Sequence, residues 1–254
     1  MLEHTFIHIP GIGTKTERHL WRQGILTWEQ CLHCKQTLFS PVRDALVRRN
    51  LEDSLENLDN ILFFRDRLSS ADLWRLFDTF RDRAVYLDIE TNGGYQGVDE
   101  ITVIGLYDGH GVQTFVNGVN LNEFDIAIEP FELVITFNGS LFDLPVISRH
   151  FPHIMLPAVH IDLRFFLKKL GYQGGLKAIE KSFSLSRAPG IDGMDGRDAV
   201  MLWKAYQWGD QSALERLIQY NTADIVHLKP LMERGYEEMK RRLLCLDHGC
   251  EQAV

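Results

Sequence analysis

The sequence predicts an α/β protein in which a five-stranded mixed sheet is flanked by helices and preceded by a small all-α domain. Two observations lead to this fold class. Apolar residues recur at helical spacing through the first 83 residues, and from residue 84 onward short β-rich segments begin and then alternate with helical patterns. We therefore expect a helical domain over residues 1–83, a sheet domain over 84–236 and a C-terminal tail over 237–254.

The helical domain is expected from two stretches of amphipathic sequence. The stretch "LVRRNLEDSLENLDNILFFRDRL" (46–68) places apolar residues at helical intervals. A second stretch, "ADLWRLFDTFRDR" (71–83), has the same periodicity, and Ser69 or Ser70 is placed to cap its first turn. We therefore expect both stretches to be helical.

The sheet is expected from five segments rich in β-branched and aromatic residues. They cover residues 84–90, 101–109, 111–117, 132–138 and 158–162. The "DGHG" sequence at 108–111 is typical of a hairpin turn, so the first three strands should form a meander. The later strands alternate with helical patterns, which dominate from about 195 to 242, and this order favours a mixed sheet.

Composition excludes some classes of protein. The chain has 254 residues, of which 45% are hydrophobic and 24% charged, as is ordinary for a globular protein. No apolar run approaches the ~18 residues of a membrane span, and the first residues do not resemble a signal peptide. We therefore expect a cytoplasmic protein with no membrane partner.

The net charge of −8 comes entirely from residues 84–254, which hold 15 Lys and Arg against 23 Asp and Glu. An acidic domain is unlike the usual nucleic-acid binder, unless divalent cations at its active site meet the phosphates.

The four cysteines leave two interpretations open. They fall in two pairs, Cys31 with Cys34 and Cys245 with Cys250, in a chain too long to depend on a disulfide framework. The pairs either hold a zinc ion or are ordinary reduced cysteines, with Cys31 at a core position of a helix.

Two acids interrupt the first predicted strand, "AVYLDIE". Asp88 and Glu90 are two residues apart, so in a strand their side chains point to the same face. Burying two carboxylates side by side is costly unless a cation lies between them. The pair is either a solvated strand end or half of a metal site.

Further acids lie where other elements meet. Asp143 follows a strand and a turn, at the kind of junction where α/β proteins often place functional residues, although taken alone it is more typical of a helix cap. Tyr220 and Asp224 share one helical face, and Tyr220 taken alone is typical of a packed core aromatic. Four carboxylates brought together would hold two Mg²⁺ or Mn²⁺ ions through hard oxygen ligands. Two such ions about 4 Å apart support phosphoryl transfer, and a nearby phenol can orient the attacking water.

Three motifs carry a resemblance to a known family. "LDIET" (87–91), "FNGSLFDLP" (137–145) and "YNTAD" (220–224) resemble the motifs of the DEDD superfamily of 3′→5′ exonucleases, which have an RNase H-like fold. The stretches "HIDLRFFLKKLGYQGGLKAIEKSF" and "GRDAVMLWKAYQWGD" resemble a stand-alone prokaryotic branch of predicted RNase H-like exonucleases. The resemblance covers roughly residues 84–235.

The resemblance implies a role for each motif residue. It implies that four acids hold two Mg²⁺ or Mn²⁺ ions, Asp143 partly through water, and these acids are Asp88, Glu90, Asp143 and Asp224. The histidine subfamily has a histidine at the position of Gln219, whereas Tyr220 fits the tyrosine subfamily. The terminal nucleotide should contact Thr91, Asn138 and Phe142.

Three further residues each allow two interpretations. Lys177 either contacts a phosphate or lies on a solvated helix face. His160 and Asp162 resemble extra ligands, but we expect Asp162 to cap the helix that follows it.

The stretch "IPGIGTKTERHLWRQGI" (9–25) resembles a helix-hairpin-helix motif. Gly11 and Gly13 would expose backbone N–H groups that bind a phosphate without reading bases, assisted by Lys15. The helix before the hairpin has little room, and Glu17 stands where a small residue is typical. The alternative is a purely structural hairpin or a protein contact.

The combined expectation is a metal-dependent 3′→5′ exonuclease that acts on single-stranded ends and releases nucleoside monophosphates. Its partner would be single-stranded nucleic acid, with DNA favoured over RNA, although no residue identifies a 2′-OH contact. The alternatives are a structure-specific endonuclease and a non-catalytic nucleic-acid-binding protein.

Overall fold

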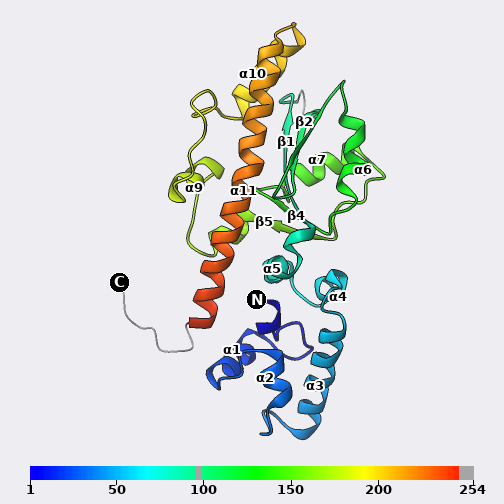
Figure 1. Cartoon of the computed structure of the whole chain (residues 1–254), viewed down its shortest axis with the longest axis vertical. Helices are drawn as coiled ribbons and strands as arrows, with labels where there is room; N and C mark the ends of the chain where they lie inside the picture. Colours follow the sequence, from blue (N-terminus) through cyan, green and yellow to red (C-terminus); the bar gives the residue numbers. More distant parts are fainter. Residues whose placement is uncertain (95–98, 246–254) are drawn as a thin grey trace. The chain divides into compact units, whose positions relative to one another are not determined.

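The computed structural model describes residues 1–94 and 99–245 of the chain (Figure 1). The chain forms two compact units, one of Met1–Arg81 with Tyr236–Val254 and the other of Asp82–Gly235. Of the four cysteines, Cys31 is buried and Cys34 half-buried, and both are free. Cys250 and the side chain of Cys245 lie outside the described residues, and so does the proposed pairing with them.

The first unit is helical, as the sequence predicts. Its helices are α1 (Thr14–Arg22), α2 (Trp28–His33), α3 (Pro41–Glu56), α4 (Ile61–Arg65) and α5 (Phe77–Phe80). Thr27 begins α2 with a capping box to Gln30, and Ser40 caps α3 ahead of Pro41 at its first position.

Residues 71–83 are helical, as expected, but they do not form one continuous α-helix. Residues Ser70–Leu76 form a 3₁₀-helix, α5 is a single turn, and Arg81–Arg83 is again 3₁₀. The Ser69 hydroxyl donates to the Asp72 carboxylate at 2.6 Å and caps no backbone group. Both helix types place side chains three to four residues apart on one face, so the apolar spacing did not distinguish them.

The second unit contains the predicted five-stranded mixed sheet. Its strands are β1 (Ala84–Thr91), β2 (Ile101–Tyr107), β3 (Val112–Val116), β4 (Leu133–Thr136) and β5 (Val159–Asp162). Their order is β3-β2-β1-β4-β5, with β1, β2 and β3 antiparallel and β1, β4 and β5 parallel. The turn between β2 and β3 is the expected hairpin, in which the Asp108 carboxylate accepts the N–H groups of His110 and Gly111.

Helices cover both faces of this sheet (Figure 1). The helices of this unit are α6 (Phe124–Ile128), α7 (Asp143–His150), α8 (Leu163–Lys168), α9 (Leu176–Ser182), α10 (Gly196–Gln207) and α11 (Gln211–Cys245), and the last continues beyond the unit. One core joins Val85, Leu87 and Ile89 of β1 to residues of α6 and α7. A second core joins the opposite face of the sheet to α10 and α11, and Trp203 and Leu217 belong to it.

Helix α11 continues to Cys245, so residues 237–245, where we expected a tail, are helical. From Tyr236 onward the chain belongs to the first unit, where the Met1 amino group donates to the Tyr236 hydroxyl at 2.6 Å. Among the helices of the described residues, none is both long and apolar enough to cross a membrane.

Candidate active site

The first two acids lie on the face of β1 that α11 covers. Val85, Leu87 and Ile89 point into the core on the opposite face, so the alternation of the strand turns Asp88 and Glu90 toward α11. Carboxylate oxygens of Asp88, Glu90 and Asp224 lie within 4.8 Å of one another. Glu90 and Asp224 are buried and Asp88 is half-buried, which contradicts the alternative of a solvated strand end.

Asp143 joins the same edge of the sheet through the backbone of β1. It is the first residue of α7, and its Oδ1 accepts the N–H of Ile89 at 3.1 Å. The cap position of α7 is Phe142, so the alternative reading of Asp143 as the capping residue is wrong. The buried Asp143 carboxylate instead lies beside the strand that carries Asp88 and Glu90.

The close approach of α11 to the sheet depends on a glycine. Gly105 of β2 pairs with Asp88, and a Cβ atom built on Gly105 would lie 2.1 Å from Asn221 Oδ1. This space lets the buried Asn221 donate from Nδ2 to Asp88 Oδ2 at 3.0 Å and to the Asp88 carbonyl at 3.2 Å. Asn221 therefore fixes the orientation of the Asp88 carboxylate.

A buried arginine contacts the acid that α11 contributes. Arg187 Nη2 donates to Asp224 Oδ1 and also to Glu180 Oε1, and Arg187 Nε donates to Glu180 Oε2 at 2.9 Å. His227 Nδ1 lies 2.9 Å from Glu180 Oε1. Because Arg187 is shared between Glu180 and Asp224, its charge neutralises the four candidate acids only in part.

The electrostatics of the cluster reflect this shortage of positive charge. Burial, followed by the charges of Asp224 and Asp143, raises the pKa of both Asp88 and Glu90 well above their usual range. Burial raises the pKa of Asp143 to about 7. Burial also raises the pKa of Asp224, although Arg187 opposes the change. The cluster therefore favours binding protons or cations over remaining fully ionised on its own.

Tyr220 lies one turn before Asp224 on α11, where it belongs to the core that packs α10 and α11 on the sheet. Burial and the nearby charges of Asp224 and Glu90 raise the pKa of its phenol, which therefore stays protonated at neutral pH. Lys177 Nζ lies 4.9 Å from the centre of the Tyr220 ring, and Arg187 Cζ lies 5.4 Å from it. The half-buried Lys177 thus contacts a site residue, unlike a lysine on a solvated face.

The donor set fits hard divalent cations. The clustered ligands are carboxylate oxygens, which Mg²⁺ and Mn²⁺ prefer, and burial together with mutual repulsion raises the pKa of Asp88 and Glu90. In the described part of the chain, Asp88, Glu90 and Asp224 form the one cluster of three or more metal-ligand side chains. Cys31 and Cys34 belong to no such cluster there.

The residues expected to contact a nucleotide lie around the same edge of the sheet. Thr91 is buried at the end of β1, and Phe142 is 37% exposed before α7. Asn138 follows β4 with a positive φ of 68°, and its N–H donates to Asp162 at 2.8 Å. Asp162 caps α8 by accepting the Arg164 N–H, as predicted, and His160 Nε2 lies 2.8 Å from the Thr136 hydroxyl.

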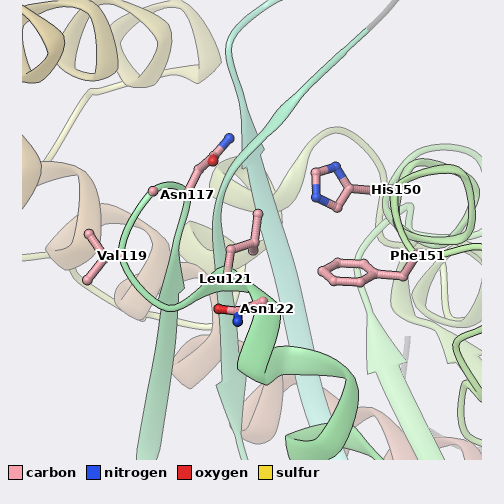
Figure 2. Close-up of a pocket in the computed structure, with 7 residues that line it drawn as sticks. Asn117, Val119, Leu121, Asn122, His150 and Phe151 are labelled. Atoms are coloured by element: carbon pink, nitrogen blue, oxygen red, sulfur yellow. The ribbon is translucent and has the colours of Figure 1, made fainter.

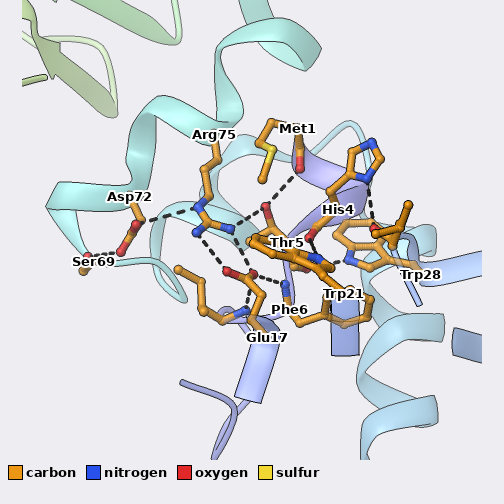
Figure 3. A network of polar contacts seen from close by, with 12 residues as sticks. Met1, His4, Thr5, Phe6, Glu17, Trp21, Trp28, Ser69, Asp72 and Arg75 are labelled. Carbon is orange, nitrogen blue, oxygen red and sulfur yellow. Dashed lines mark hydrogen bonds and ion pairs between the residues drawn. The ribbon is translucent and has the colours of Figure 1, made fainter. Parts of the chain in front are cut away.

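The candidate phosphate-binding residues of the first unit are exposed. Gly11 has a φ of 81°, Gly13 caps α1, and Lys15 lies in the first turn of that helix. The helical segment before the hairpin is a 3₁₀-helix of three residues, Leu2–His4. Glu17 is buried and forms a paired hydrogen bond with Arg75, at 2.9 and 3.0 Å (Figure 3). Glu17 therefore has a structural role in this unit.

Three residues of the site were missed from the sequence. Arg187 lies in a loop without a local pattern that marks it. Asn221 lies inside the "YNTAD" motif, where a polar residue on the packed face of a helix is a usable signal. Gly105 interrupts a strand pattern, and a glycine there indicates close approach of another element.

Comparisons with known proteins bear on this domain. A family model described as the RNase_H superfamily (RNase_H_2) matches residues 85–236. No curated protein matches the chain.

Similar solved structures include a family B DNA polymerase from the hyperthermophilic archaeon Pyrobaculum calidifontis, with 15% identity, 59% of this chain and 24% of that chain covered, and a TM-score of 0.49. Escherichia coli RNase D has 18% identity, covers 73% of this chain with 49% of its own, and gives a TM-score of 0.47. Brucella melitensis NrnC with bound Mg²⁺ has 21% identity, coverages of 68% and 83%, and a TM-score of 0.44. The match thus spans about a quarter of the polymerase and half of RNase D.

Proposed function

Because the chain belongs to the RNase H superfamily, we propose that it is a metal-dependent nuclease that trims single-stranded nucleic acid from the 3′ end. One observation carries the proposal. Asp88, Glu90 and Asp224 come from elements far apart in the sequence, and their carboxylate oxygens gather within 4.8 Å of one another with too little positive charge around them. Folding such a cluster is costly, and divalent cations would remove the cost.

The proposed ligands of two Mg²⁺ or Mn²⁺ ions are the four acids of the DEDD-like motifs, Asp88, Glu90, Asp143 and Asp224. When bound, such ions activate a water molecule and stabilise the leaving oxygen of a phosphodiester. Asn221 supports this role by holding the Asp88 carboxylate with a 3.0 Å hydrogen bond. The Ile89 N–H does the same for Asp143 at 3.1 Å. Backbone and amide donors thus orient two of the four ligands before any cation arrives.

Tyr220 is proposed to orient the attacking water. Its raised pKa keeps the proton on the phenol, so the hydroxyl can donate one hydrogen bond and accept another but does not act as a base. Lys177 and Arg187 over the Tyr220 ring restrict where that ring can move. A tyrosine at this position, with Gln219 before it, supports assignment to the tyrosine subfamily of the DEDD exonucleases.

Other parts of the chain have proposed contacts with the substrate. Thr91, Asn138 and Phe142 would contact the terminal nucleotide, with single-stranded DNA favoured over RNA. In the first unit, the exposed turn of Gly11 and Gly13 with Lys15 would hold a backbone phosphate, as the helix-hairpin-helix resemblance implies.

The proposal is tested by a time course with Mn²⁺ on 5′-labelled single-stranded DNA and RNA of one sequence. We expect a ladder that shortens from the 3′ end. Asp88→Ala should lower the rate more than a thousandfold, a barrier increase of about 4 kcal/mol. Asp125→Ala is the matched control, because this exposed acid lies on α6, on the other face of the sheet, and should cleave as wild type does.

Other outcomes would contradict specific parts of the proposal. Internal cuts without end trimming would indicate an endonuclease. Oligonucleotide binding without cleavage, equal in wild type and Asp88→Ala, would indicate a non-catalytic binding protein.

A further inference from the structure

A cavity of about 790 Å³ opens beside the ends of β4 and α8, within the size range of ligand pockets. Its polar lining includes Asn138, Arg164, Lys168 and Gln173. The ring of Tyr172 forms part of the wall and is held against Phe183, with ring centres 4.7 Å apart. None of the four acids lines this pocket, but Asn138, which is expected to contact the terminal nucleotide, does.

The pocket adjoins the acid cluster along the sheet. Strands β1 and β4 are parallel neighbours, with Tyr86 paired to Ile135. Asp88 lies two residues further along β1, and β4 ends at Thr136, one residue before Phe137. The segment directly after β4, Phe137 and Asn138, lines the pocket, so the pocket begins where the strand next to β1 ends.

A second connection runs through the start of α9. Gly174 and Gly175 line the pocket immediately before this helix. Two residues later, Lys177 lies over the ring of Tyr220. Asn138 therefore lines the pocket after β4, and Lys177 lies two residues beyond the lining residue Gly175 at the start of α9.

The lining of the pocket is cationic. Arg164 and Lys168 are one turn apart on α8, both are exposed, and both reach the cavity. Among the described residues that line it, none is Asp or Glu. Asp162 lies next to Asn138, but its oxygens already accept from the backbone N–H groups of Asn138, Ser140 and Arg164.

A second pocket of the same unit provides a contrast (Figure 2). It has a volume of about 380 Å³ and is lined by Asn117, Leu121, Asn122, His150 and Phe151 among others, without an arginine or a lysine among the described lining residues. An anionic ligand is therefore expected in the Arg164 pocket and not in this one.

We propose that the Arg164 pocket binds the phosphate and sugar of the nucleotide on the 5′ side of the scissile bond, so that the preferred substrate is an oligonucleotide. This inference rests on the proposed nuclease function. Arg164 donates from Nη1 to Asn138 Oδ1, and a guanidinium has five N–H donors, so one side chain can hold Asn138 and a phosphate oxygen together. Lys168 supplies the second charge.

The test compares Lys168→Ala with Lys181→Ala, which removes an equal charge from an exposed position on α9 outside the pocket. Two substrates are used, heptathymidylate and the p-nitrophenyl ester of thymidine 5′-monophosphate, which has no nucleotide on the 5′ side. We expect Lys168→Ala to raise the KM for heptathymidylate, divided by the KM for the p-nitrophenyl ester, about tenfold. The loss of one charge-assisted hydrogen bond has an effect of this size. Lys168→Gln should act in the same way, whereas Lys181→Ala should leave the ratio within about twofold of wild type.

Binding provides a readout that does not depend on cleavage. Fluorescence anisotropy of labelled heptathymidylate, measured in an Asp88→Ala background, gives the slope of log affinity against log salt concentration. Loss of one phosphate contact should reduce this slope by about 0.7 in Lys168→Ala and leave it unchanged in Lys181→Ala.

The two readouts separate failure of the pocket from failure of the nuclease. The pocket assignment is wrong if Lys168→Ala and Lys181→Ala give the same KM ratio and the same slope, or if Lys168→Ala changes both KM values equally. If wild type cleaves neither substrate, the nuclease function fails, and the salt slope alone then decides whether the pocket binds a phosphate.

Discussion

Glu17 in the first unit and the four acids in the second are all carboxylates removed largely from water, but their surroundings differ. Glu17 accepts hydrogen bonds from both terminal nitrogens of Arg75 and from the N–H of Phe6 at 2.7 Å (Figure 3). Among the described residues, the four acids form one ion pair, between Asp224 and Arg187. Arg187 is also paired with Glu180.

This difference distinguishes a carboxylate with a structural role from a carboxylate that is suited to bind a cation. A buried carboxylate with a guanidinium and a backbone N–H around it has its charge and its lone pairs satisfied within the fold. A cluster whose members raise one another's pKa is satisfied only when a proton or a cation joins it. Removing Glu17 should therefore lower the free energy of unfolding, whereas removing one acid of the cluster in the absence of metal should not lower it.

The largest expected effect on stability is that of Glu17→Gln. The substitution leaves Arg75 buried with Asp72 as its remaining ionic partner, whose Oδ1 is 3.7 Å from Arg75 Nε. Breaking a buried pair from one side costs about 3–5 kcal/mol, and we expect about 3 because Asp72 compensates in part. Urea unfolding followed by circular dichroism measures the change. Asp224→Asn, in EDTA, is the opposing control and should not destabilise the protein; equal losses in the two variants would remove the distinction between the regions.

Much of the second region could be predicted from the sequence alone. Runs of β-branched residues marked the five strands, and the cost of burying Asp88 and Glu90 on one strand face indicated a cation. The spacing of Tyr220 and Asp224 placed both on one face of what proved to be α11. These inferences concern residues that are close in the sequence, or residues at the ends of neighbouring strands, which the sheet brings close together.

Pairs between distant loops and helices could not be predicted. Glu17 and Arg75 are 58 positions apart, and Arg187 and Asp224 are 37 apart, with no spacing rule that connects them. From the sequence, Glu17 was only an exception to a hairpin motif, whereas its ion pair with Arg75 explains why this position is a glutamate. The same limit applies to the Arg164 pocket, whose lining comes from the segment after β4, from α8 and from the loop that precedes α9.

The second prediction concerns the effect of divalent cations on stability. If the acid cluster holds Mn²⁺, a concentration one hundred times its Kd should stabilise the wild type by about 2.7 kcal/mol. For a chain of this size that is a rise in Tm of about 5–11 °C. Differential scanning calorimetry with and without Mn²⁺ measures it.

Variants from the two regions sharpen this second test. Asp88→Asn should melt no lower than wild type in EDTA and should lose the Mn²⁺ response, whereas Glu17→Gln should melt lower and keep it. A full response in Asp88→Asn would mean that the cation binds elsewhere.

The smallest effect is a difference in pH dependence between the two regions. His8 is buried in the first unit, with Nε2 2.9 Å from the Ser54 hydroxyl and its ring 5.2 Å from that of Trp28. Burial, followed by the charge of Arg67, lowers the pKa of His8 from 6.5 to about 4. The folded state then binds fewer protons than the unfolded state. His8 therefore costs no stability above pH 6.5, and the free energy of unfolding falls as the pH drops from 6.5 toward 4. The loss is on the order of 2 kcal/mol by pH 5.

The raised pKa of Asp143, about 7, has the opposite sign. Without metal the folded state binds the extra proton, so this acid costs stability as the pH rises from about 4 to 7. The free energy of unfolding in EDTA should therefore fall from pH 7.5 to 5 more steeply in wild type than in His8→Gln, because only wild type must keep a buried imidazole neutral. In Asp143→Asn the fall should be steeper than in wild type, because the compensating gain is lost. Parallel pH profiles for all three proteins would show that neither buried group distinguishes the two regions in the way the structure indicates.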